Sequence, residues 1–285
     1  MRMSILSSCY IMYYSLEDTI RRAADAGYDA VDFLAAAPHA EPREFDGRAR
    51  EKIRKLAESR GLRINQIATF APPNSGSYAD MEGHVKGQCE RLDFARDVGA
   101  SHLEVVPGFK RPHLAAELTW KWAIEAHKQI VEHGERIGMP VAVECEPLQP
   151  NQRMWGRPMP ANVYDLRTLR RFIDEIGSRY CAANLDIGHC NIVARGNPAS
   201  IKEDILALRG RIIGIHCNDN DGITDLNAVP GKGSCNFEYY LGLLKDMGYG
   251  GFVSIELEGQ EEPLPAAAES LDVIKGILVK LDAYN

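Results

Sequence analysis

The stretch IIGIHCNDNDG (residues 212–222) begins as a buried strand and ends among polar side chains. Its first half is apolar and β-branched, which is typical of a strand inside a parallel sheet. A helical pattern, FEYYLGLLKDMG (237–248), follows, and then a second apolar run, FVSIELE (252–258). A strand, a helix and a strand in this order predict a right-handed unit with two parallel strands.

The same unit recurs along the whole chain. Six further runs have the composition of strands: MSILSS near the start, 30–35, 64–70, 102–107, 141–146 and 183–188. Glycines stand where the intervening helical patterns end, at Gly27, Gly61, Gly99, Gly138, Gly177 and Gly248. Eight strand–helix units in 285 residues predict an α/β protein with a (β/α)8 TIM barrel. The alternative is a doubly wound open sheet, which needs no eighth strand, and no G-x-G-x-x-G follows the first strand.

Composition limits the domain organisation and the partners. No linker or change of composition divides the chain, so we expect one domain over residues 1–285. The formal net charge of -7 argues against a nucleic-acid surface and against an anionic membrane. No segment approaches the roughly 20 apolar residues of a membrane span, and the start lacks the apolar core of a signal peptide. Because the 7 cysteines are scattered without a C-x-x-C pair, we expect a cytoplasmic protein without a disulfide framework.

Polar side chains end the last four predicted strands. They are Glu144 and Glu146, Asp186, His216, and Glu256 and Glu258. Active-site residues of a TIM barrel lie at the carboxyl ends of its strands. A carboxylate within an apolar strand costs several kcal/mol unless it is paired or bound to a metal. Carboxylates and one imidazole on neighbouring strands therefore predict a site for Mn, Co, Zn or Mg.

Two ambiguities remain within this set. Strand alternation places Glu144 and Glu146 on the same face, and likewise Glu256 and Glu258. Glu146 is nearer the loop and precedes Pro147, which favours it as the ligand, while geometry leaves the other pair open. Taken singly, a histidine at a strand end also fits a hydrogen-bonded loop residue, and an aspartate fits a helix N-cap.

Several motifs resemble one known family. They are CEPLQP (145–150), LDIGHCN (185–191), IHCNDNDG (215–222), PGKG (230–233) and GYGGFVSIELEG (248–259). Across nearly the whole chain, the sequence resembles the xylose-isomerase-like TIM-barrel family of sugar isomerases and epimerases. The resemblance implies that one divalent metal, most often Mn, is bound by Glu146, Asp186, His216 and Glu256. It also implies acid–base roles for Glu146 and Glu256, and substrate contacts for His189 and His39.

Three more residues are candidate substrate contacts. Trp155 and Arg153 lie in the long Pro-containing loop 149–162, where an indole could stack on a sugar and a guanidinium could bind an anionic group. Asp219 follows His216 closely and is assigned to the substrate as well.

The resemblance implies a metal-dependent isomerase or epimerase that moves a proton through an enediolate of a keto-sugar or polyol ketone. A dehydratase or lyase of a keto-sugar, inosose or 3-keto-glycoside, including C-glycosides, is the first alternative, because NDNDG and QPNQRM replace the Arg and Glu of ketohexose epimerases. An apurinic-site endonuclease is more remote, since Val106 and Asn227 stand where further histidines are expected. A non-enzymatic binding barrel is the last alternative. The partner is a small carbohydrate, and both a monomer and a homo-oligomer stay open.

Overall fold

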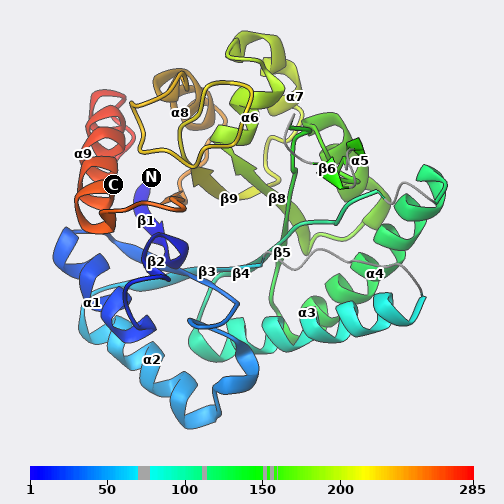
Figure 1. Ribbon diagram of the computed structural model, residues 1–285, viewed down its shortest axis with the longest axis horizontal. Coiled ribbons are helices and arrows are strands. Elements are labelled where there is room, and N and C mark those ends of the chain that lie inside the picture. Colours follow the sequence, from blue (N-terminus) through cyan, green and yellow to red (C-terminus); the bar gives the residue numbers. More distant parts are fainter. Residues whose placement is uncertain (70–77, 111–113, 150–152, 155–156, 159) are drawn as a thin grey trace.

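Eight parallel strands form a closed barrel with helices around it (Figure 1). This computed structural model describes residues 1–285 except 70–77, 111–113, 150–152, 155–156 and 159. Around the barrel the strands run β1-β10-β9-β8-β5-β4-β3-β2. Their bounds are β1 (Arg2–Leu6), β2 (Ala30–Leu34), β3 (Arg63–Ala68), β4 (His102–Val105), β5 (Val141–Glu144), β8 (Cys181–Asp186), β9 (Ile212–Cys217) and β10 (Phe252–Ile255). The predicted TIM-barrel class is confirmed.

The helices pack outside the barrel, between successive strands. They are α1 (Leu16–Ala26), α2 (Gly47–Ser59), α3 (Tyr78–Val98), α4 (Ala116–Ile137), α5 (Leu166–Ile176), α6 (Ile187–Val193), α7 (Lys202–Leu206), α8 (Phe237–Asp246) and α9 (Pro263–Lys280). Short 3-10 turns occupy η1 (Ser7–Tyr10), η2 (Pro42–Glu44) and η3 (Pro198–Ile201). A two-stranded hairpin, β6 (Arg153–Met154) with β7 (Arg157–Pro158), lies in the loop after β5.

Local sequence explains where these helices begin and end. The Ser15 side chain accepts a hydrogen bond from the backbone of Asp18 and caps α1, and Asp165 caps α5 in the same way through Thr168. Gly27 ends α1 with φ of 92°, a left-handed conformation that costs glycine little. None of the helices in the described ranges is both long enough and apolar enough to cross a bilayer.

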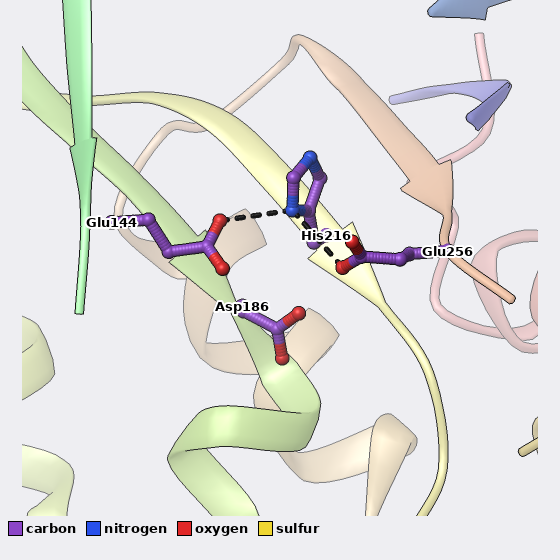
Figure 2. Close-up of side chains that lie close together, drawn as sticks. All are labelled: Glu144, Asp186, His216 and Glu256. Atoms are coloured by element: carbon purple, nitrogen blue, oxygen red, sulfur yellow. Dashed lines mark ion pairs between the residues drawn. The ribbon is translucent and has the colours of Figure 1, made fainter. Parts of the chain in front are cut away.

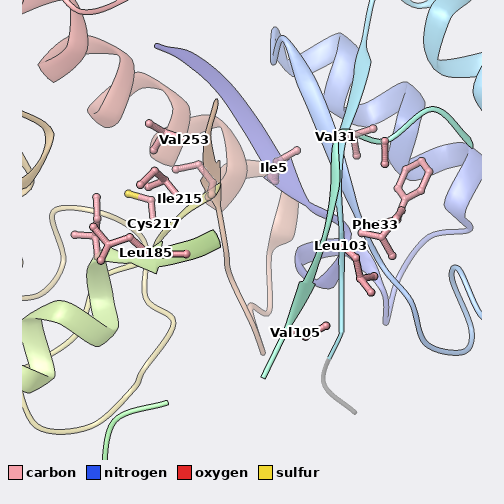
Figure 3. Close-up of a cluster of buried hydrophobic side chains, with 14 of the residues drawn as sticks. Ile5, Val31, Phe33, Leu103, Val105, Leu185, Ile215, Cys217 and Val253 are labelled. Carbon is pink, nitrogen blue, oxygen red and sulfur yellow. The ribbon is translucent and has the colours of Figure 1, made fainter. Parts of the chain in front are cut away.

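The two faces of the barrel strands differ sharply in polarity. Apolar side chains point outward against the helices, and Figure 3 labels nine of them: Ile5, Val31, Phe33, Leu103, Val105, Leu185, Ile215, Cys217 and Val253. The residues between them in the sequence face inward, and many are buried polar groups: Ser4, Asp32, Gln66, His102, Glu104, Asn184 and Ser254. Branched apolar side chains usually fill a TIM barrel. In this barrel, buried polar side chains instead occupy the interior below the carboxyl ends of the strands.

Candidate metal centre

Four side chains from neighbouring strands meet at the carboxyl end of the barrel (Figure 2). Glu144 ends β5, Asp186 ends β8, His216 lies near the end of β9, and Glu256 directly follows β10. Each offers one ligand atom, and all four atoms lie within 4.8 Å of one another. All four residues are buried. The strand register explains the convergence, because Asp186 pairs with His216 and both side chains face inward at the same level.

His216 lies between two carboxylates. Its Nδ1 atom is 2.9 Å from an oxygen of Glu144 and 3.2 Å from an oxygen of Glu256. Among the described residues, however, Nδ1 has no partner in hydrogen-bond geometry. The other ring nitrogen contacts the amide of Gln66, which fixes the ring plane. An ion bound by His216 together with the two carboxylates would need Nδ1 to be free of hydrogen bonds and to face them, as it does here.

The four residues fit a divalent ion. Bonds of about 2.1 Å place opposite ligands about 4.2 Å apart, and a small carboxylate rotation would bring the present atoms to that spacing. Three oxygens and one nitrogen suit Mn, Mg, Co or Zn. The fit rests on this donor set and on the hydrogen-bond-free Nδ1 of His216.

The electrostatics of the cluster call for positive charge. Burial raises the pKa of Asp186 well above its usual range, and burial also raises that of Glu256. For Glu144, burial opposes ionisation, but the imidazole of His216 and that of His189 more than offset it and lower its pKa. For His216, the carboxylates of Glu256 and Glu144 outweigh burial and raise its pKa. A divalent ion would replace the proton on His216 and stabilise all three carboxylates as anions.

The strand-five residue in the cluster is Glu144, whereas the prediction named Glu146 as the ligand. The strand stops at Glu144, and the backbone N–H of Glu146 then donates to the carbonyl of Val163 in the following loop. The Glu146 carboxylate accepts a hydrogen bond from Gln149 at 3.3 Å. The prediction favoured Glu146 because it is nearer the loop and precedes Pro147, but β5 already ends at Glu144. The other three predicted ligands, Asp186, His216 and Glu256, lie together in the cluster.

His189 lies against the cluster. Its Nδ1 atom is 3.1 Å from Glu144, and its Nε2 atom is 3.3 Å from the carboxylate of Asp225. Its backbone N–H donates to Asp186, which is therefore the N-cap of α6 as well as a member of the cluster. Asp225 was not among the predicted site residues. Its position in the loop after β9, close in sequence to His216, was the feature that could have pointed to it.

The other predicted substrate contacts lie elsewhere or have other partners. His39 is buried with its Nε2 atom 2.7 Å from the backbone carbonyl of Tyr14. Asp219 is buried and accepts from four backbone N–H groups of its own loop: Asn220, Gly231, Gly233 and Cys235. These bonds brace the loop, and the substrate contact of Asp219 stays a prediction. The backbone of Arg153 pairs with that of Pro158, and Trp155 lies outside the described residues.

A second polar layer beneath the cluster was not predicted. His102 lies 2.8 Å from the Oε1 atom of Gln66, whose amide nitrogen contacts His216. Glu104 accepts from the backbone of Thr69 at 2.9 Å, and burial raises its pKa well above the usual range. The signal was present in INQIATF and HLEVVP, where polar residues alternate with apolar ones.

A family model described as "Xylose isomerase-like TIM barrel" matches residues 20–277. The chain belongs to this family. Proteins similar to this chain include the fructoselysine 3-epimerase of Escherichia coli O157:H7, which is 23% identical over 274 residues, covering 92% of this chain and 94% of that protein.

Solved structures agree on the fold. A D-tagatose 3-epimerase-like protein superposes with a TM-score of 0.82 at 21% identity, covering 99% of this chain and 98% of the other. The IOLI protein, solved with a bound zinc atom, has a TM-score of 0.79 at 15% identity, with 99% and 98% of the two chains covered.

Proposed function

We propose that this protein is a divalent-metal-dependent epimerase or isomerase of a keto-sugar or related polyol ketone. The observation that carries the proposal is the buried cluster, in which the carboxylates of Glu144 and Glu256 lie on either side of His216 (Figure 2). The named relative is a 3-epimerase, which supports a proton-transfer reaction on a carbohydrate.

The proposed ion is Mn, with Co, Mg and Zn as alternatives. When bound, the ion would supply a Lewis acid that acidifies the C–H bond next to a ketone. Glu144, Asp186, His216 and Glu256 would hold it. The zinc atom in the structure of the similar IOLI protein supports a divalent ion in a protein of this fold.

The chain's own carboxylates would move the proton. Glu144 comes from β5 and Glu256 from the end of β10, so each can reach a different face of a sugar bound between them. One carboxylate removes the proton next to the ketone, and the other returns a proton to the resulting enediolate. We therefore propose Glu144, in place of Glu146, as the acid–base partner of Glu256. His189, 3.1 Å from Glu144, is proposed to orient a sugar oxygen beside it.

Solvent deuterium exchange tests the proposal. Metal-stripped protein is reloaded with Mn, Co, Mg or Zn and incubated in D2O with a panel of ketopentoses, ketohexoses and inososes. We expect deuterium at the carbon next to the ketone with at least one ion, measured by NMR, and no deuterium after chelation or in Glu256→Gln. A protein that binds metal but exchanges no sugar proton would refute the proposal.

Elimination is the second candidate, and the loop after β9 favours it. In this loop the Asn218 amide donates to the carboxylate of Asp186, and the Asn220 amide donates to the carbonyl of Gly188 in α6. Ketohexose epimerases, which the sequence resembles, are expected to have an arginine in this loop. Product analysis separates the two, because elimination yields an unsaturated ketone or a released group. The endonuclease is disfavoured, because Asn227 offers Asp225 an amide where that chemistry expects an imidazole. Cytoplasmic location, the single domain and a homo-oligomer stay predictions, which fractionation, limited proteolysis and light scattering would test.

A further inference from the structure

Two buried asparagines contact carboxylates of the metal centre. The side-chain amide of Asn184 donates to Glu144, and that of Asn218 donates to Asp186 at 2.9 Å. Both asparagines are fully buried. Only the NH2 group of an asparagine can donate to a carboxylate, so each side-chain carbonyl points away from the carboxylate that its amide contacts. Among the described residues, neither of these carbonyl oxygens has a hydrogen-bond partner.

A glycine makes room for the first asparagine. Asn184 of β8 pairs with Glu144 of β5 on one side and with Gly214 of β9 on the other. A Cβ atom on Gly214 would overlap the Asn184 carbonyl oxygen and would lie 2.9 Å from Nε2 of His102. Gly214 has no positive φ, so its backbone conformation is open to alanine. The lack of a side chain at Gly214 is therefore explained by the space that the Asn184 amide needs.

The second asparagine is accommodated in the same way. A Cβ atom on Gly188, in α6, would overlap the Asn218 carbonyl oxygen and would lie 2.7 Å from the Cγ atom of that residue. Gly188 also has no positive φ. We call Asn184 with Gly214, and Asn218 with Gly188, the asparagine–glycine pairs. Each pair places one amide against one carboxylate of the cluster.

The unpaired carbonyls indicate what the amides are for. A buried oxygen without a partner costs free energy on folding, and an apolar side chain of similar size would avoid that cost. The N–H groups offset it by fixing one oxygen of each carboxylate. The other oxygen of Asp186 accepts from the backbone N–H of His189, and that of Glu144 lies 3.1 Å from Nδ1 of His189. Neither carboxylate can rotate without giving up one of these contacts.

We propose that the asparagine–glycine pairs position the carboxylates of Glu144 and Asp186 for a small divalent ion and disfavour Ca²⁺. This inference rests on the metal centre of the proposed function and concerns its ion specificity. Mg and Zn bind oxygens at about 2.0–2.2 Å, whereas Ca²⁺ needs about 2.3–2.6 Å and often takes both oxygens of one carboxylate. A carboxylate that is held at both oxygens cannot easily turn both of them toward one ion.

Metal binding by the chelator-stripped protein tests the inference without a sugar. Electron paramagnetic resonance measures Mn affinity, and competition with Mn measures Ca²⁺ affinity. In Asn184→Ala we expect Mn affinity to fall about 10- to 100-fold. Because a freed carboxylate suits Ca²⁺ better, the preference for Mn over Ca²⁺ should fall at least about 5-fold, and Asn218→Ala should behave alike. An equal loss for both ions would mean a merely structural role and would overturn the inference.

Gly214→Ala tests the first pair without removing a ligand or its donor. The new Cβ should displace the Asn184 amide and weaken Mn binding about 10-fold. In the double variant with Asn184→Ala there is no amide to displace, so the loss should equal that of Asn184→Ala alone. Losses that multiply would show that Gly214 acts through His102, and the pairing would be wrong. The control is Gly134→Ala, whose Cβ would overlap the carbonyl oxygen of Met139, before β5; it should leave the preference unchanged.

The outcomes separate this inference from the proposed function. Unchanged Mn affinity in Asn184→Ala overturns the inference and leaves the proposed function intact. If the variant loses Mn affinity and preference as expected but the parent protein exchanges no sugar proton, the proposed function alone is wrong. A parent protein that binds none of the ions overturns both.

Discussion

Glu144 and Glu146 are separated by one residue, yet it is Glu144 that reaches His216, at 2.9 Å from Nδ1. We expect Glu144→Gln to lose bound metal and to slow proton exchange at least about 100-fold, because it removes a ligand and an acid–base group together. Glu146→Gln, the matched control, should stay within about 5-fold of the parent protein. Metal analysis and deuterium exchange measure both effects. A larger loss in Glu146→Gln would restore that residue as the ligand.

Gln66 is expected to act as a positioning residue for His216. Its amide contacts the ring nitrogen that faces away from the cluster and is itself paired with His102 at 2.8 Å. Gln66→Leu keeps much of the volume but removes this contact, and we expect about 10- to 100-fold weaker Mn affinity. Mn titration followed by electron paramagnetic resonance measures it. Gln66→Glu places a carboxylate oxygen where the amide nitrogen contacts His216, and this oxygen can accept from the Nε2–H that the imidazole carries when Nδ1 binds the ion, so part of the affinity should be recovered. Unchanged affinity in Gln66→Leu would contradict the role.

Asp219 and Asp221 offer a matched pair in the loop after β9. The buried carboxylate of Asp219 accepts from four backbone N–H groups, whereas the exposed Asp221 accepts from two. We expect Asp219→Asn to lower the free energy of unfolding by about 2–4 kcal/mol, since bonds to a charged acceptor are lost in a buried place. Asp221→Asn should cost less than about 1 kcal/mol. Thermal unfolding of the two variants decides between bracing and substrate contact for Asp219.

Acid should destabilise the barrel through His127. This residue is fully buried between helices, and burial lowers its pKa to about 4 from an ordinary value of 6.5. As the pH falls, His127 is protonated in the unfolded chain before it is protonated in the folded protein. Its contribution to the free energy of unfolding is therefore fully present above about pH 6.5 and is lost as the pH falls toward 4. The loss reaches about 2 kcal/mol at pH 5.

His127→Phe tests that titration. The variant keeps an aromatic ring next to Phe172, whose centroid lies 5.1 Å away, but it cannot bind a proton. The difference in unfolding free energy between pH 8 and pH 5 should therefore shrink by about 2 kcal/mol. His133→Gln, on the same helix but partly exposed, is the control and should retain most of the difference. An unaltered pH dependence in His127→Phe would contradict the assignment.

Most of the architecture could be predicted from local patterns. Apolar runs, helical periodicity and terminal glycines depend on neighbouring residues, so all eight barrel strands were found near their observed bounds. The choice between Glu144 and Glu146 depended on where β5 stops. That point is set by a hydrogen bond from Glu146 to Val163, a residue 17 positions further on, which no local pattern reveals.

The same reason explains the other differences. The expected substrate contact of Asp219 rested on its closeness to His216 in the sequence, but its carboxylate is occupied by N–H groups of residues 231, 233 and 235. The layer of Gln66, His102 and Glu104 could have been found, since these polar residues alternate with apolar ones in their strands. What the sequence could not show is that the layer supports His216 from two strands on the opposite half of the barrel.

The cluster occupies only one arc of the barrel, since β5, β8, β9 and β10 supply all four of its residues. The arc from β1 to β4 is consequently free to change its loops by recombination or by design while the ion-binding half is kept whole. Replacing the N-terminal half of the barrel with that of another protein would exchange all of its loops at the carboxyl end of the strands in one step. The seams would have to keep the strand pairings of β1 with β10 and of β4 with β5, and also a Gln66 equivalent that contacts His216 across the interior.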